Sequence, residues 1–109
     1  MSTRIEQLKI FLSESPNDPF LHYALAQEYH KHGDENAALE KYEYLLEVHP
    51  KYVATYYHLG ALLSKMRQKE NALETYSKGI AIAKELGDAH ALSELQSAKL
   101  NLELDDDDE

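Results

Sequence analysis

The sequence predicts an all-α fold of antiparallel helical hairpins stacked in series, with about six helices. Residue types recur at a step of 34 positions: Leu25, Ala38, Leu39, Glu40 and Tyr42 return as Leu59, Ala72, Leu73, Glu74 and Tyr76. Within each segment the apolar residues follow helical spacing. No alternating run of β-branched residues predicts a strand, and Val occurs only at positions 48 and 53. A fixed period of this length is typical of repeated helical hairpins.

The chain has the length and composition of one globular domain, which we expect over residues 1–104. Its 109 residues are 43% hydrophobic and 28% charged, as in ordinary folded proteins. The absence of cysteine excludes disulfide bonds and thiolate chemistry. No stretch approaches the roughly 20 apolar residues of a membrane span, and the N-terminus lacks an apolar run of signal-peptide length. We therefore expect a cytoplasmic protein that does not enter the membrane.

The charge is acidic, with a formal net value of −9. Much of the excess lies in residues 105–109, which are all Asp or Glu and which we expect to form a disordered tail. The lysines are scattered singly along the chain. Nucleic acids and anionic membranes select clustered Lys and Arg, so neither is an expected partner.

The first helix is predicted over residues 3–14. Thr3 and Glu6 have the spacing of a capping box, in which each side chain accepts a backbone N–H of the other residue. Apolar residues then follow at helical spacing: Ile5, Leu8, Phe11 and Leu12.

The second and third helices are predicted over residues 19–32 and from Asp34 to Val48. Asp18 and Pro19 suit the N-cap and the first turn of the second helix. Gly33 is a natural left-handed terminator, and Asp34 is the N-cap that follows it. His49 and Pro50 then end the third helix.

The last three helices are predicted over residues 52–66, 69–86 and 89–102. The end of the first of these is less clearly marked, because Arg67 stands where Gly33 stood in the preceding hairpin. Gly87 repeats the terminator ahead of the final helix.

The recurring residues resemble the tetratricopeptide repeat, whose pattern is W-x2-L-G-x2-Y, then A-x3-F, then P. The first copy reads His22-x2-Leu25-Ala26-x2-Tyr29, Ala38-x3-Tyr42 and Pro50. The second copy reads Tyr56-x2-Leu59-Gly60-x2-Leu63 and Ala72-x3-Tyr76. Two positions depart from the pattern, since His22 replaces the aromatic residue and Lys84 replaces the second closing proline.

This resemblance implies a right-handed superhelix with repeat one over residues 19–50 and repeat two over 53–86. Small residues such as Ala26 and Gly60 are expected where two helices approach closely. A step of 34 back from Tyr42 and Leu45 reaches Leu8 and Phe11, so the first helix is interpreted as the second half of a truncated repeat. The helix over 89–102 is interpreted as a cap. It is expected to bury Leu92, Leu95 and Leu102 and to expose Ser93, Glu94, Gln96, Ser97 and Lys99.

The same resemblance implies a binding groove, because the first helix of each repeat lines the concave face in this family. The expected partner-binding residues are Phe20, Tyr23, Gln27, His30, Lys31, Tyr57, His58, Ser64 and Lys65. Tyrosine combines an apolar ring with a hydrogen-bonding tip and is common at binding surfaces. The alternative for Tyr23 and Tyr57 is that they pack between hairpins.

Lys31 and Lys65 recur in phase, so they could hold an acidic peptide or a C-terminal carboxylate, or they could be solvated lysines. Members of the family that bind chaperone tails use a clamp of Lys, Asn and Arg. The matching positions here hold Tyr23, Gln27, His58, Asp88 and Leu92. Because only the amide of Gln27 resembles the clamp, a chaperone tail is not the expected partner.

The sequence predicts neither a metal or cofactor site nor catalysis. Six histidines are present, but His30 and His32 are two apart on a helix and the others lie in separate elements. Neither a nucleophile motif nor a phosphate-binding glycine loop occurs. The carboxylates of Glu40, Glu43 and Glu47 are interpreted as a solvated helix face.

The predicted function is therefore that of a protein-interaction module, an adaptor or scaffold. It would hold a peptide segment or helix of a partner protein in the concave aromatic groove. The alternative is a self-associating assembly module that forms a homodimer through the groove or the terminal helices.

Overall fold

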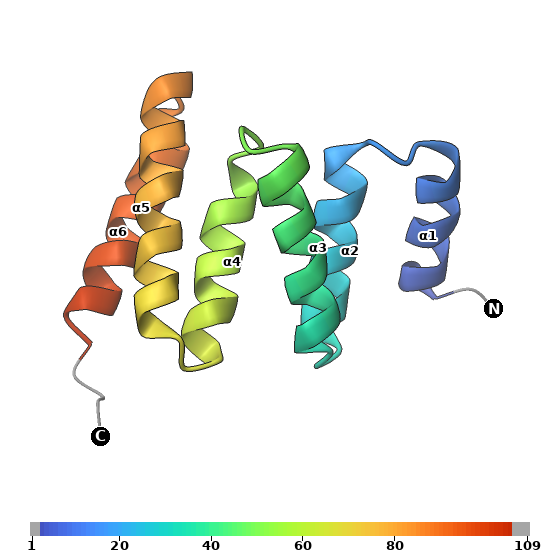
Figure 1. Cartoon of the computed structure of the whole chain (residues 1–109), viewed down its shortest axis with the longest axis horizontal. Helices are drawn as coiled ribbons and strands as arrows, with labels where there is room; N and C mark the ends of the chain where they lie inside the picture. The colour runs from blue at the N-terminus through green and yellow to red at the C-terminus, as the bar shows by residue number, and fades with distance from the viewer. Residues whose placement is uncertain (1–2, 106–109) are drawn as a thin grey trace. The chain divides into compact units, whose positions relative to one another are not determined.

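A computed structural model describes residues 3–105, which form six helices (Figure 1). They are α1 (Arg4–Glu14), α2 (Pro19–Lys31), α3 (Glu35–Val48), α4 (Ala54–Lys65), α5 (Lys69–Leu86) and α6 (Ala89–Glu103). Within this part of the chain no residue is in a strand, and the all-α prediction is confirmed. The predicted acidic tail lies outside the described residues except for Asp105.

The predicted helix starts are present as side-chain caps. The Oδ1 atoms of Asp18, Asp34 and Asp88 accept backbone N–H bonds at the starts of α2, α3 and α6, at 2.9, 3.2 and 3.0 Å. These bonds satisfy donors that a helix leaves unpaired in its first turn. By contrast, the N-cap residues of α4 and α5, Val53 and Gln68, make no side-chain cap hydrogen bond.

The helix ends use the left-handed backbone conformation at three positions. Gly33 and Gly87 have φ values of +83° and +71°, as the sequence predicts. Arg67, at the position equivalent to Gly33, adopts the same conformation with φ of +67°. Its side chain therefore bears a steric cost that a glycine would avoid.

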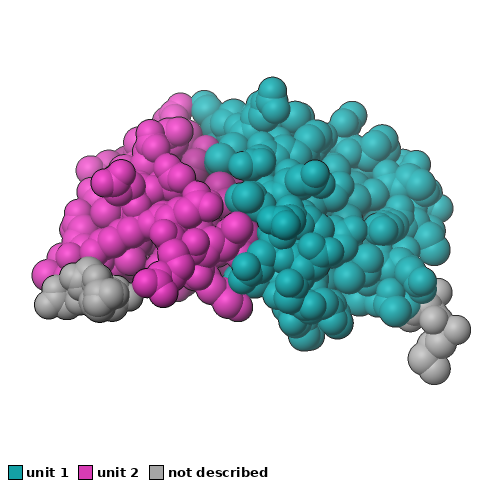
Figure 2. Space-filling model, turned by 60° about the horizontal axis from the view of Figure 1, so that its bottom comes forward, with its two compact units in different colours: residues 1–52 teal, residues 53–109 magenta. Residues whose placement is uncertain are grey.

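The chain divides into two compact units, residues 1–52 and 53–109 (Figure 2). In the first unit, α2 packs against both α1 and α3. One core cluster joins Leu8 of α1 to Ala24 and Leu25 of α2. Ala38, Tyr42 and Leu45 of α3 are fully buried. In this unit the framework positions of the repeat therefore form the core.

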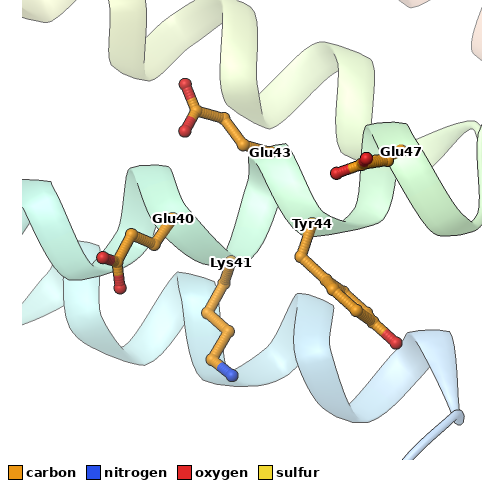
Figure 3. Close-up of a pocket in the computed structure, with 5 residues that line it drawn as sticks. All are labelled: Glu40, Lys41, Glu43, Tyr44 and Glu47. Carbon is orange, nitrogen blue, oxygen red and sulfur yellow. The ribbon is translucent and has the colours of Figure 1, made fainter.

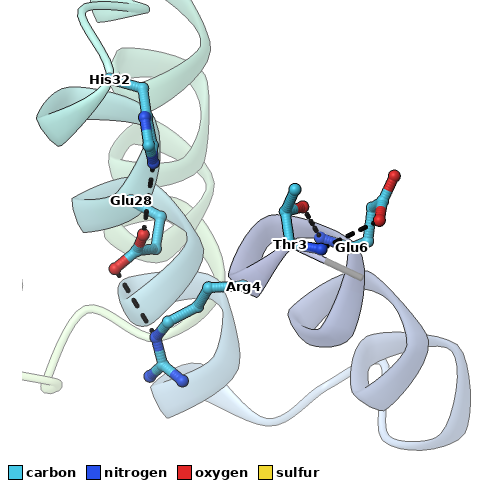
Figure 4. A network of polar contacts seen from close by, with 5 residues as sticks. All are labelled: Thr3, Arg4, Glu6, Glu28 and His32. Carbon is cyan, nitrogen blue, oxygen red and sulfur yellow. Dashed lines mark hydrogen bonds and ion pairs between the residues drawn. The ribbon is translucent and has the colours of Figure 1, made fainter. Parts of the chain in front are cut away.

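Polar contacts add to the attachment of α1 (Figure 4). The backbone N–H of Glu6 donates to Thr3 Oγ1 at 3.1 Å, and the N–H of Thr3 donates to Glu6 Oε1 at 3.0 Å. The predicted capping box is thus confirmed. Glu28 of α2 lies 3.5 Å from Arg4 Nε and 3.7 Å from His32 Nε2. Arg4 and His32 are exposed while Glu28 is half-buried, and only the Arg4–Glu28 pair links α1 to α2.

In the second unit, α5 packs against α4 and α6, and α4 also contacts α6. Two glycines allow close helix contacts. A Cβ on Gly60 would lie 2.3 Å from Tyr76 Cε1, and one on Gly79 would lie 2.5 Å from Tyr56 Cβ. The contact at Gly60 agrees with its expected role. Gly79 is a further close-contact position, which the repeat pattern did not predict.

The first helix has an exposed aromatic residue, and the last helix differs from the sequence interpretation at one residue. Phe11 remains 51% exposed although its counterpart Leu45 is fully buried. The reason is that no helix precedes α1 within the described residues to complete a hairpin. Lys99 of α6 was expected in water but is half-buried, with its Nζ 3.9 Å from Glu103 Oε2.

The other expectations for α6 agree with the structure. Leu95 is buried, Leu92 and Leu102 are half-buried, and the remaining polar residues of the expected outer face are exposed. None of the helices in residues 3–105 has the length and hydropathy needed to cross a lipid bilayer. The single domain expected over residues 1–104 stays a prediction.

Candidate functional site

Five of the predicted groove residues lie on α2: Phe20, Tyr23, Gln27, His30 and Lys31. Their spacing of three or four residues places Phe20, Tyr23, Gln27 and Lys31 along one side of the helix. Phe20 and Lys31 are exposed, and the other three are half-buried. This side of α2 therefore offers both apolar and polar groups.

An aromatic cluster forms at the start of α2, where Tyr23 contacts both Phe20 and Tyr52. The ring centroids of Phe20 and Tyr23 are 6.4 Å apart, and those of Tyr23 and Tyr52 are 5.7 Å apart. Such distances favour ring packing. Tyr23 thus packs against other rings of its own unit and remains partly accessible to solvent, and its contact with a partner stays a prediction.

Tyr52 was not among the predicted site residues. The sequence places it at the start of a helix over 52–66, whereas α4 begins at Ala54 and leaves Tyr52 in the preceding turn. The sequence signal that could have identified Tyr52 is its position as an aromatic residue just after the helix end at His49 and Pro50. Its pKa is raised by burial and by the nearby Asp18 carboxylate.

Tyr42 lies in the core of the same unit and is fully buried. Burial raises the pKa of its hydroxyl, and the neighbouring Tyr23 raises it further. The phenol therefore keeps its proton at neutral pH.

The other four predicted residues lie on α4: Tyr57, His58, Ser64 and Lys65. Tyr57 is 37% exposed, and its ring centroid lies 5.4 Å from that of His58 and 6.5 Å from that of Tyr76. Tyr76 is buried over Gly60. The ring of Tyr57 therefore packs against the buried ring of Tyr76 and remains partly accessible to solvent.

Each unit holds its own part of the predicted site. The structure brings Phe20 and Tyr23 together on α2, and Tyr57 and His58 together on α4. Lys31 and Lys65 are both exposed, each at the end of its helix. That the two parts line one continuous groove stays a prediction.

A shallow surface hollow on α3 is lined by acidic and aromatic side chains (Figure 3). Its residues are Glu40, Lys41, Glu43, Tyr44 and Glu47. Lys41 and Tyr44 extend over α2, and Glu43 points to the opposite side. All three glutamates are exposed, which agrees with their interpretation as a solvated face. In residues 3–105, no three His, Asp or Glu side chains are arranged to hold a metal ion.

No protein-family model matches the chain, and no curated protein matches it. Among solved structures, the crystal structure of a tetratricopeptide repeat domain protein from Salinibacter ruber is 49% identical, with a TM-score of 0.77. The match covers 81% of this chain and 99% of that one. A solution structure of a tetratricopeptide repeat domain protein from the same organism is 47% identical, with a TM-score of 0.80, and covers 86% and 96%.

A more distant neighbour is the solution structure of a protein from Bordetella parapertussis. It is 26% identical, has a TM-score of 0.80, and covers 94% of this chain and 89% of that one. The repeated helical hairpins and the similarity to these proteins place the chain in the class of helical-repeat interaction modules. Within that class, the chain belongs to the tetratricopeptide repeat family.

Proposed function

We propose that this protein binds a peptide segment or helix of a partner protein on the exposed sides of α2 and α4. The binding residues would be the nine predicted ones together with Tyr52. The observation that carries the proposal is Phe20, which is 51% exposed while it packs against Tyr23 at a centroid distance of 6.4 Å. A large apolar ring held half in water is available to a partner at little cost in side-chain entropy.

The physical basis is the combination of rigid aromatic rings with polar tips. Tyr23 and Tyr57 each rest on other aromatic rings, so a partner would meet surfaces that are already ordered. Aromatic anchors of this kind dominate the binding energy at many interfaces. A surface of two short helices predicts a modest affinity, roughly micromolar.

The charges of the site favour a protein partner over nucleic acid. Lys31 and Lys65 are its exposed cations, in a chain of net charge −9. Nucleic-acid binding relies on clustered cations that replace counterions. The role we propose for these residues is binding, and none of them is assigned a chemical step.

A double substitution tests the proposal. Tyr23→Ala with Tyr57→Ala should abolish capture of partner proteins from the native cell lysate, while helicity by circular dichroism stays unchanged. Phe20→Ala should weaken capture on its own. The matched control is Phe11→Ala, which removes an equally exposed ring from α1. Capture that survives the double substitution, or that Phe11→Ala abolishes equally, would refute the proposal.

A second candidate function is self-association through α1. Ile10 and Phe11 are 55% and 51% exposed on neighbouring positions of that helix, which makes α1 a candidate association surface. Light scattering over a concentration series tests it. A dimer that dissociates on Phe11→Glu would support homodimerisation, and a monomer at all concentrations would exclude it.

A further inference from the structure

His22 fastens the connection between α1 and α2. It lies in the first turn of α2, is 7% exposed, and has its Nε2 atom 2.8 Å from the carbonyl oxygen of Pro16. Because a carbonyl oxygen can only accept, Nε2 carries the proton and donates it. The ring thus ties the backbone that leads out of α1 to the helix that follows.

The surroundings of the Nδ1 atom of His22 are compatible only with a neutral imidazole. Nδ1 is buried and has no hydrogen-bond partner among the described residues. The ring of Tyr44 lies against the imidazole, with a centroid distance of 4.2 Å and an angle of 34°. A proton on Nδ1 would place a charged N–H where no acceptor is within reach, and burying an unpaired charge is costly.

The groups that face His22 come from three segments. Burial lowers its pKa most, and the hydrogen bond to Pro16 opposes that shift. Lys41 of α3 and His49, which follows α3, lower the pKa further through their positive charge, and Asp18 raises it slightly. His49 Nε2 is also buried, and it has no hydrogen-bond partner among the described residues.

We propose that His22 is a pH-sensitive latch, closed on Pro16 when neutral and opened by protonation, which releases the α1–α2 connection. To solvate a proton on Nδ1, the ring must leave its place under Tyr44, and this movement breaks the bond to Pro16. Attachment of α1 would then depend on the packing of Leu8 and its polar contacts with Glu28. A helix of 11 residues is too short to persist by itself in water.

The direction of the pH dependence follows from the lowered pKa. His22 binds a proton less readily in the folded chain than in the unfolded chain, whose histidine has the ordinary pKa of 6.5. Neutral His22 therefore stabilises the folded chain fully above pH 6.5, and this stabilisation is lost as the pH falls below that value. Carboxylates of ordinary pKa remain charged until the pH is more acidic, so they contribute little in this window.

Thermal unfolding by circular dichroism at about pH 7.5 and about pH 5.5 tests the latch, on protein without a histidine tag. The wild type should melt several degrees lower at the acidic pH. His22→Gln keeps a donor for Pro16 and cannot titrate, so its melting temperature should hardly depend on pH. His90→Gln is the matched control, because His90 is exposed, and it should behave as the wild type. Full pH dependence in His22→Gln, or its loss in His49→Gln instead, would overturn the proposal.

An NMR titration of the wild type keeps the test independent of whether a variant folds. The His22 ring should titrate at a lower pH than that of His90, and amide signals of residues 4–14 should change with the midpoint of His22. A His22 midpoint at or above that of His90, or α1 signals that ignore it, would also overturn the proposal.

Discussion

The two hairpins, α2–α3 and α4–α5, have the same arrangement of helices but form their turns and helix contacts with different residues. At the turn between their helices, the first hairpin has Gly33 followed by the capping Asp34, and the second has Arg67 followed by Gln68 without a cap. Both turns nevertheless form with left-handed backbone at the first position. Packing of the helices is therefore sufficient to impose this turn where the local sequence does not favour it.

At the contact between its two helices, the second hairpin is the one whose residues fit more closely. Tyr42 is fully buried beside a first helix that carries Ala26, and its counterpart Tyr76 lies so close to Gly60 that a Cβ there would overlap its ring. The second hairpin is thus less favourable than the first at its turn and closer at its helix contact. Substitutions at equivalent positions should separate these two differences.

The largest expected effect is at the close contact. Gly60→Leu should lower the free energy of unfolding by about 1–3 kcal/mol or more, because the side chain must displace the Tyr76 ring or the helix. Ala26→Gly, at the equivalent position of the first hairpin, should cost about 1 kcal/mol through helix propensity. Urea unfolding measures both. Equal losses would mean that the two contacts are alike.

Substitutions at the turns between the helices of each hairpin should change the free energy of unfolding by an intermediate amount. Gly33→Arg should cost about 1 kcal/mol, because a side chain is then forced into the left-handed conformation. Arg67→Gly should stabilise the protein by about 0.5–1 kcal/mol, since it removes the same strain. The melting temperatures should move in opposite directions. If Arg67→Gly destabilises, the arginine side chain makes a contribution that outweighs its backbone strain.

Similar or smaller changes in stability are expected at the caps of α3 and α5. Asp34→Gln should remove the 3.2 Å bond to the Ala37 N–H and cost about 1 kcal/mol. Gln68→Asp should gain about 0.5 kcal/mol, because an aspartate can accept a first-turn N–H but gives up the 2.8 Å bond between Gln68 and Asn71. Chemical denaturation checks both values, and a double variant should show that they add.

Most of the fold could be predicted because its signals are local. Asp18, Gly33 and Gly87 define helix boundaries through their own backbone preferences, and the observed helices begin and end within two residues of the predicted ranges. The start of α4 was placed two residues early because Val53 gives no capping signal. Gly79 was missed because a close contact depends on which helices are neighbours.

The candidate site was less predictable than the fold. Family resemblance placed Tyr23 and Tyr57 on the first helix of each repeat, and both are found there. Their supporting rings, Tyr52 and Tyr76, come from other elements, so contact with them depends on tertiary packing. A glycine in the middle of α5 was a usable signal for Gly79, since glycine destabilises a helix unless packing requires it.

The most direct test of the interaction surface is an NMR titration with the bound segment of a partner recovered by affinity capture. Amide and aromatic signals of Phe20, Tyr23, Tyr52 and Tyr57 should shift and saturate together, and the same segment should leave the Tyr23→Ala, Tyr57→Ala protein unperturbed. Shifts concentrated on the glutamate face of α3 or on α6, with the aromatic signals unchanged, would contradict the proposed binding surface.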